Sequence, residues 1–185
     1  MSAIFAKSDE DSKWASRFMF VAIIQGAIAL ILIAILLYLA VFGVPKVSRI
    51  IASGSAGTWL TIGFTGFVLV GVIGTAVSAL FYQHIEVGLG KPYANFGNLL
   101  AWLHLVLMNV GAVVAGGLMM YAGYIGGAGL LPTSVGGGGL NGGEVHEILA
   151  GYPLPIAIFM GIGAFGVLLG GIGYVTTWLW KSRAA

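Results

Sequence analysis

The stretch FMFVAIIQGAIALILIAILLYLAVFGV, residues Phe18–Val44, decides the fold of this chain. It contains no charged side chain and exceeds the about 20 residues that an α-helix needs to cross the hydrocarbon core of a bilayer. Three similar stretches follow at Thr58–Tyr82, Leu99–Ile125 and Leu154–Trp180. The sequence therefore predicts an all-α integral membrane protein, a single membrane domain over residues 1–185, with four transmembrane helices in an up-down bundle.

Composition supports this fold class and excludes several others. Of the 185 residues, 59% are hydrophobic and 8% are charged, whereas about a quarter of the residues of a soluble protein are charged. The net charge of +2 is too small to indicate a nucleic-acid partner. The chain has no cysteine, which excludes disulfides, thiolate metal sites and Fe–S clusters. The expected surroundings are lipid and other membrane proteins.

Basic residues predict the orientation. Six lie on the side of the termini and two on the other side, and an excess of Lys and Arg marks the cytoplasmic side. Both termini are therefore expected in the cytoplasm of a multi-pass protein of the plasma membrane. The first apolar run is too long for a signal-peptide core and lacks a cleavage pattern, so we interpret it as a retained helix. The cytoplasmic set is Lys7, Lys13, Arg17, Lys91, Lys181 and Arg183; the outer set is Lys46 and Arg49.

Two outer loops connect the spans. Val47–Ala52 is expected to form a short interfacial helix, and Glu144–Ala150 a short outer helix before the fourth span. The glycine-rich loop over residues 126–143 has little intrinsic order, so we expect it to move or to be pinned by a neighbouring protein.

Small residues recur at helical spacing within the spans. Such spacing lets helix backbones approach closely in lipid, where no hydrophobic force drives helices together. Two interpretations stay open, namely packing within one four-helix bundle and docking of other subunits. The residues are Gly71, Thr75 and Ala79; Gly111 and Ala115; and Gly163, Gly166, Gly170 and Gly173.

His104 is the most interesting polar side chain of the spans, because ionisable groups inside a membrane are functional candidates. His84 lies at the same membrane side, so the two could in principle ligate a b-type haem. The alternatives are a hydrogen-bonded packing histidine and a contact to a quinone headgroup. Asn109 is expected to make an interhelical hydrogen bond.

Glu144, His146 and Glu147 form the only acidic cluster on the outer side. Their carboxylates and imidazole would suit a Zn or Cu ion if a partner added ligands. The alternative is a solvated helix start, where Glu is favoured in the first turn. The pattern lacks the two-histidine spacing of a zinc protease.

Several classes of function are disfavoured. The spans carry no Asp, Glu, Lys or Arg, which argues against a proton pump, an ion-coupled transporter or a voltage sensor. The glycine runs follow a membrane helix rather than a strand and lack the Lys-Ser/Thr pair of a phosphate-binding loop.

The part of the chain from Thr58 to Gly127 carries a series of short motifs: Ile62-Gly63-Phe64-Thr65-Gly66-Phe67, Phe81-Tyr82-Gln83-His84-Ile85-Glu86, Gly90-Lys91-Pro92-Tyr93, Gly97-Asn98-Leu99-Leu100-Ala101-Trp102-Leu103-His104, Met108-Asn109-Val110-Gly111 and Tyr121-Ala122-Gly123-Tyr124-Ile125-Gly126-Gly127. This layout resembles a late helix pair in subunit I of haem-copper oxidases. The second predicted span lacks the paired histidines that the catalytic family needs. No catalytic residue is therefore carried over, and this chain cannot itself hold a haem-copper centre.

Two further motifs lie near the N-terminus, Ser12-Lys13-Trp14-Ala15 and Ile23-Ile24-Gln25-Gly26. With them, the chain also resembles the small four-helix membrane proteins found with terminal-oxidase subunits in ammonia-oxidising archaea. This resemblance implies a non-catalytic accessory subunit of a respiratory complex, not an enzyme by itself and without a cofactor of its own. Two alternatives stay open: a small b-type haem or quinone-interacting electron carrier, and an accessory subunit of a copper membrane monooxygenase.

Overall fold

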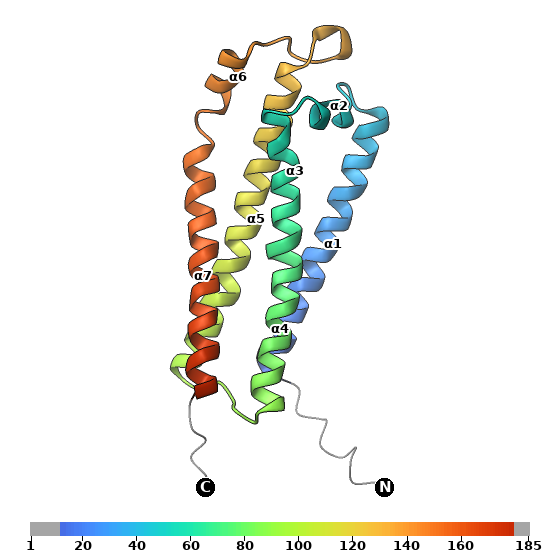
Figure 1. Ribbon diagram of the computed structural model, residues 1–185. Helices are drawn as coiled ribbons and strands as arrows, with labels where there is room; N and C mark the ends of the chain where they lie inside the picture. The colour runs from blue at the N-terminus through green and yellow to red at the C-terminus, as the bar shows by residue number, and fades with distance from the viewer. Residues whose placement is uncertain (1–11, 180–185) are drawn as a thin grey trace.

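Four long helices run side by side through residues 12–179, which are the residues that the computed structural model describes (Figure 1). Each is long and apolar enough to cross a membrane, so the chain is a multi-pass membrane protein. The shortest measures about 40 Å at 1.5 Å per residue, more than the about 30 Å of a hydrocarbon core. The predicted all-helical fold with four spans is confirmed. The spans are α1 (Lys13–Phe42), a second span over Ala56–Gly88, α5 (Phe96–Leu130) and α7 (Pro153–Leu179).

The second span is built from four successive helical segments. Two of them are π-helical, and π-helical segments are frequent at functional sites. The segments are α3 (Ala56–Gly66), η1 (Phe67–Gly74), α4 (Thr75–Gln83) and η2 (His84–Gly88).

The ends of the spans depart from the predicted bounds for local reasons. α1 begins at Lys13 rather than Phe18, because Ser12 caps it by accepting a hydrogen bond on Oγ from Ala15 N at 2.9 Å. α5 continues to Leu130, five residues beyond the predicted end. A Cβ atom on Gly126 would lie 2.8 Å from Ala56 Cβ, so the glycine-rich helix end is packed tightly against α3. Packing overrides the low helix propensity of glycine here, and the predicted loop start at residue 126 is wrong.

The two ends of the molecule differ. The lower end in Figure 1 holds the start of α1, the end of α7 and the loop over residues 89–95. The upper end holds three short helices: α2 (Val47–Ala52), η3 (Thr133–Val135) and α6 (Gly142–Leu149). α2 has the predicted bounds. α6 begins at Gly142 rather than Glu144, because Asn141 and Glu144 form a capping box.

Backbone hydrogen bonds order the glycine-rich loop. Gly138 N donates to Ala128 O at 3.0 Å, and Leu140 N donates to Gly129 O at 2.9 Å. Gly139 N donates to Leu131 O at 2.8 Å. The chain itself therefore holds the loop against the end of α5. The sequence had led us to expect either a moving loop or one held by a neighbouring protein.

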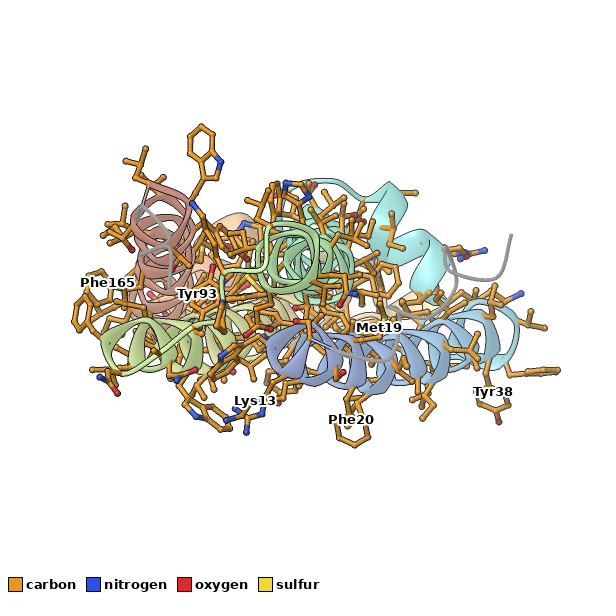
Figure 2. All side chains as sticks on the ribbon, turned by 90° about the horizontal axis from the view of Figure 1, so that it is seen from below. Lys13, Met19, Phe20, Tyr38, Tyr93 and Phe165 are labelled. Carbon is orange, nitrogen blue, oxygen red and sulfur yellow. The ribbon has the colours of Figure 1, made fainter. Side chains whose placement is uncertain are left out.

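The four spans alternate in direction, but they do not surround one common axis. α5 packs along α7 and α3, whereas α1 packs mainly against α4 and η1. α1 and α7 lie on opposite sides of the second span (Figure 1). Figure 2 shows Phe20 and Tyr38 of α1 and Phe165 of α7 pointing away from the other helices. The up-down order is as predicted, with open sides in place of a closed bundle.

Candidate functional site

Three polar side chains from three spans meet in the interior. Asn109 Oδ1 accepts hydrogen bonds from Gln25 Nε2 of α1 and from Thr75 Oγ1 of α4, the latter at 2.7 Å. Asn109 Nδ2 donates to Leu105 O at 2.6 Å. All three polar side chains are buried. The interhelical hydrogen bond expected of Asn109 is present, and it joins three spans rather than two.

Gly71 makes room for the Gln25 side chain. A Cβ atom on Gly71 would overlap Gln25 Oε1 and would lie 3.2 Å from the ring of Phe67. Gln25 Oε1 is buried and has no hydrogen-bond partner among residues 12–179. Thr75 and Ala79 follow Gly71 at helical spacing and are also buried. This small-residue face of the second span is therefore the one against which α1 packs.

His104 lies inside a cluster of aromatic rings. Its ring centroid is 4.9 Å from that of Phe18, 6.0 Å from that of Tyr82 and 5.8 Å from that of Tyr174. Its Nδ1 and the hydroxyl of Tyr82 are 3.3 Å apart. A Cβ atom on Gly170 would collide with the imidazole, so the backbone of α7 packs directly against the ring with no side chain between them. With 2% of its surface exposed, His104 has the geometry of a packed, hydrogen-bonded histidine.

His84 is placed differently. It is exposed, and its Nδ1 would lie 3.2 Å from a Cβ atom on Gly88. His84 follows Tyr82 by two residues, so the two side chains leave the helix on different sides. Tyr82 contacts His104, and His84 is not among the ring neighbours of His104. The bis-histidine haem therefore stays a prediction that this geometry does not favour.

The outer acidic cluster lies on α6. Glu144 Oε2 accepts a hydrogen bond from Asn141 N at 2.8 Å as part of the capping box. His146 and Glu147 are exposed. Within residues 12–179, no group of three or more His, Asp or Glu side chains could hold a metal ion. The metal site at these residues stays a prediction, and the observed contact of Glu144 is that of a helix start.

A polar anchor at the lower end ties α1 to the second span, and the sequence analysis missed it. Glu86 Oε2 accepts hydrogen bonds from Ser12 Oγ and from Trp14 N, the latter at 3.2 Å. Trp14 Nε1 donates to Asn98 Oδ1 at 2.8 Å. Polar and aromatic residues at the end of a membrane span were the available signal, but their pairing is a tertiary property.

Arg17 lies beside two indole rings next to this anchor. Its guanidinium carbon is 4.7 Å from the ring centroid of Trp14 and 4.7 Å from that of Trp102. The two rings meet edge to face, 5.4 Å apart. This double cation–π contact fixes α1 against α5 where the spans end.

The glycines of α7 bring its backbone onto α5. A Cβ atom on Gly111 would lie 2.5 Å from Gly163 Cα, and one on Gly166 would lie 2.5 Å from Met108 N. The contact is therefore between backbones. Ala115 is buried, as are all four spaced glycines of α7: Gly163, Gly166, Gly170 and Gly173.

Hollows within the described residues include two that are lined by residues of several helices. One, of about 340 Å³, lies between the second span and α7 at the level of His104. The other, of about 510 Å³, lies at the lower end and is lined by Lys91, Asn95, Thr176 and Thr177 among others. Lys91 Nζ donates to Trp178 O, which joins the loop to the end of α7. Both hollows combine residues that are far apart in the chain, so sequence reasoning had no signal for them.

No protein family, curated protein or solved structure matches this chain.

Proposed function

We propose that this chain is a non-catalytic subunit of a larger membrane complex, in which its spans pack against the helices of other subunits. The observation that supports this best is the use of the polar side chains within the spans. Gln25, Thr75 and Asn109 bond to one another, and His104 is packed among aromatic rings. These groups hold helices together, which favours a structural role over transport.

The shape of α1 also supports a partner. No side chain from Leu30 to Phe42 is buried within the protein. α1 is the most apolar span. Over an 18-residue apolar stretch its mean hydropathy is 2.9, against 1.9 to 2.1 for the other spans, and only 17% of that stretch is buried. A helix that is apolar on all sides needs cover from lipid or from other helices. Leu36, Leu39 and Ala40 pack in part against α2 and α3, and the remaining exposed surface of the upper half of α1 is well suited to a neighbouring subunit.

The complex that we propose is a respiratory one in the plasma membrane, with a haem-copper terminal oxidase as the first candidate. This choice rests on the resemblance to four-helix proteins found with archaeal terminal oxidases. Both termini would lie in the cytoplasm. The chain would contribute helix packing, and the catalytic subunit would carry the haem and copper.

Purification from native membranes tests the proposal. The tagged chain is extracted in mild detergent, and the eluate is analysed by mass spectrometry and by a reduced-minus-oxidised spectrum. We expect oxidase subunits in the eluate and haem in proportion to them. Elution of the 19.1 kDa chain without other membrane proteins would contradict the proposal.

Crosslinking then locates the contact. A photoreactive amino acid is placed at Tyr38 of α1 or at Phe165 of α7, which point away from opposite sides of the molecule (Figure 2). Both side chains are more than half exposed, so neither substitution disturbs the interior. We expect a partner crosslink from position 38. Crosslinks to lipid alone from both positions would argue against a helix-packing role.

A further inference from the structure

An intramembrane groove separates the second span from α7. α7 packs along α5 rather than along α4. A gap of about 340 Å³ therefore remains between the second span and α7, and His104 and Met108 of α5 line it as well. Tyr174 closes its lower end by stacking on Phe81, with ring centroids 5.3 Å apart. The residues that shape the groove include Val70, Gly74, Phe81, Val167, Gly171 and His104.

Two glycines keep the groove open. A Cβ atom on Gly171 would meet nothing within 4 Å, and one on Gly74 would meet only Leu69 O, at 3.4 Å. The glycines of α7 that face α5 differ, since a Cβ atom on Gly166 would lie 2.5 Å from Met108 N. Gly171 therefore serves no helix contact within the protein, and its missing side chain leaves room beside His104.

His104 is among the residues that line this apolar groove, and one of its two ring nitrogens has no hydrogen-bond partner among the described residues. The ring is 98% buried (2% exposed), and its one hydrogen-bond contact within the described residues joins Nδ1 to the Tyr82 hydroxyl. Nε2 has no protein partner there. When Tyr82 donates to Nδ1, Nε2 carries the ring proton and is a donor. A donor without an acceptor is costly inside a membrane, so a ligand oxygen at Nε2 would be stabilising.

A second polar group lies in the same groove. The Tyr174 hydroxyl lies 3.5 Å from Ser78 O, longer than the about 2.5–3.0 Å of an ordinary O–H···O hydrogen bond. The groove residues include no Lys, Arg, Asp or Glu. The polar groups of the groove are thus an imidazole and hydroxyls, all uncharged, among apolar walls, which suits a neutral carbonyl and does not suit a phosphate or a carboxylate.

We propose that the groove binds a quinone, a membrane-soluble molecule with a carbonyl-bearing ring and an apolar tail. One ring carbonyl accepts a hydrogen bond from His104 Nε2, and the ring lies near Phe81. The tail follows Val70 and Val167 toward the lipid. The volume lies within the range of about 300–1,000 Å³ of small-molecule sites. The inference concerns binding alone and does not depend on the proposed function, because the site lies within this one chain.

Binding of decylubiquinone to the purified chain tests the inference. The matched variants are Gly171→Leu, which fills the groove, and Gly161→Leu on the same helix, where a Cβ atom also meets nothing within 4 Å. We expect about tenfold weaker binding for Gly171→Leu and unchanged binding for Gly161→Leu, because a side chain in the groove displaces the ring. Equal binding by both variants would overturn the proposal.

The headgroup contact has its own readout. Infrared spectra should show the carbonyl stretch of bound decylubiquinone at lower frequency, and this shift should be lost in His104→Phe. Decylbenzene, which has a tail and a ring without carbonyls, should bind at least about tenfold more weakly. Should His104→Phe fail to fold, the comparison of Gly171→Leu with Gly161→Leu and the comparison with decylbenzene still test the quinone site. Equal binding of decylbenzene, or crosslinks from position 171 to a partner helix in native membranes without quinone, would contradict a quinone site.

Discussion

The upper and lower halves of this molecule hold their helices together in different ways. In the upper half, α3 and α5 meet backbone to backbone. A Cβ atom on Gly123 would lie 2.8 Å from Leu60 Cα, and one on Gly63 would lie 2.7 Å from Gly116 O. In the lower half, large side chains fill the space between the helices, among them the fully buried Trp14, Phe18 and Tyr82.

The difference shows two solutions to one problem. Lipid is as apolar as the helices, so burial alone does not drive their association in a membrane. The upper half gains dispersion contacts by removing side chains, whereas the lower half gains specific hydrogen bonds and ring contacts by adding them. The upper half should therefore be sensitive to added volume, and the lower half, apart from the contact of Gly166 and Gly170 with α5, to lost polar atoms.

The largest effect is expected from volume added to the upper half. Gly123→Ala places a methyl group against the backbone of α3, and we expect a loss of about 2–3 kcal/mol in the free energy of unfolding. Gly117→Ala on the same helix is the control. A Cβ atom there meets nothing within 4 Å, so the higher helix propensity of Ala should stabilise by up to about 1 kcal/mol. Unfolding by SDS in mixed micelles measures both free energies. If the two variants changed the free energy of unfolding in the same direction, the backbone contact at Gly123 would be refuted.

A second effect is expected from the polar triad of the interior. Asn109→Leu removes the acceptor for Gln25 and Thr75, and we expect a loss of about 1–2 kcal/mol. The double variant with Gln25→Leu should cost less than the sum of the two single variants, because it leaves no carboxamide of the pair unpaired. A double-mutant cycle in the same unfolding assay gives the coupling. Additive losses would mean that the two side chains do not interact.

A smaller, local effect is expected at the cap of α6. Asn141→Ala removes the acceptor for Gly143 N and Glu144 N and should cost about 1 kcal/mol of local stability. Amide hydrogen exchange should accelerate in α6 and stay unchanged in the four spans. Asn141→Asp keeps an acceptor and should restore protection. Faster exchange throughout α5 would show that the cap also supports the spans.

The smallest effect is expected from the hydroxyl of Tyr82. Tyr82→Phe keeps the ring stacked 4.8 Å from Phe18 and removes only the contact to His104 Nδ1. The expected loss is about 0.6 kcal/mol, an average value for a hydrogen bond between membrane helices. Tyr38→Phe on the exposed side of α1 should change nothing. A loss above about 2 kcal/mol would assign the hydroxyl a larger part in the aromatic cluster.

Sequence patterns predicted the spans because hydropathy acts over many residues at once. Local chemistry set the ends, and there the predictions were less accurate. Ser12 extends α1 toward the N-terminus, and close packing of Gly126 on Ala56 keeps α5 helical through a run of glycines. α2 was predicted with its observed bounds.

The candidate site was predictable only in part. His104 and Asn109 stood out as polar residues in apolar spans, and both lie in the interior. The distances that give them a role involve Tyr82, Gln25 and Thr75 on other helices, and no spacing along the chain encodes such distances. The pairing of His104 with His84 stays a prediction, which the placement of His84 on another side of its helix from Tyr82 does not favour.

The sequence by itself determined that this chain has four membrane-spanning helices, because an apolar run of this length is stable only in the bilayer. It also determined that the helices can approach closely, because glycines recur at helical spacing. Only the tertiary structure decided which glycines are covered by a neighbouring helix and which, such as Gly171, stay open beside His104. Helix contacts depend on how the spans are placed around one another, and that placement is the sum of many weak contacts between distant residues.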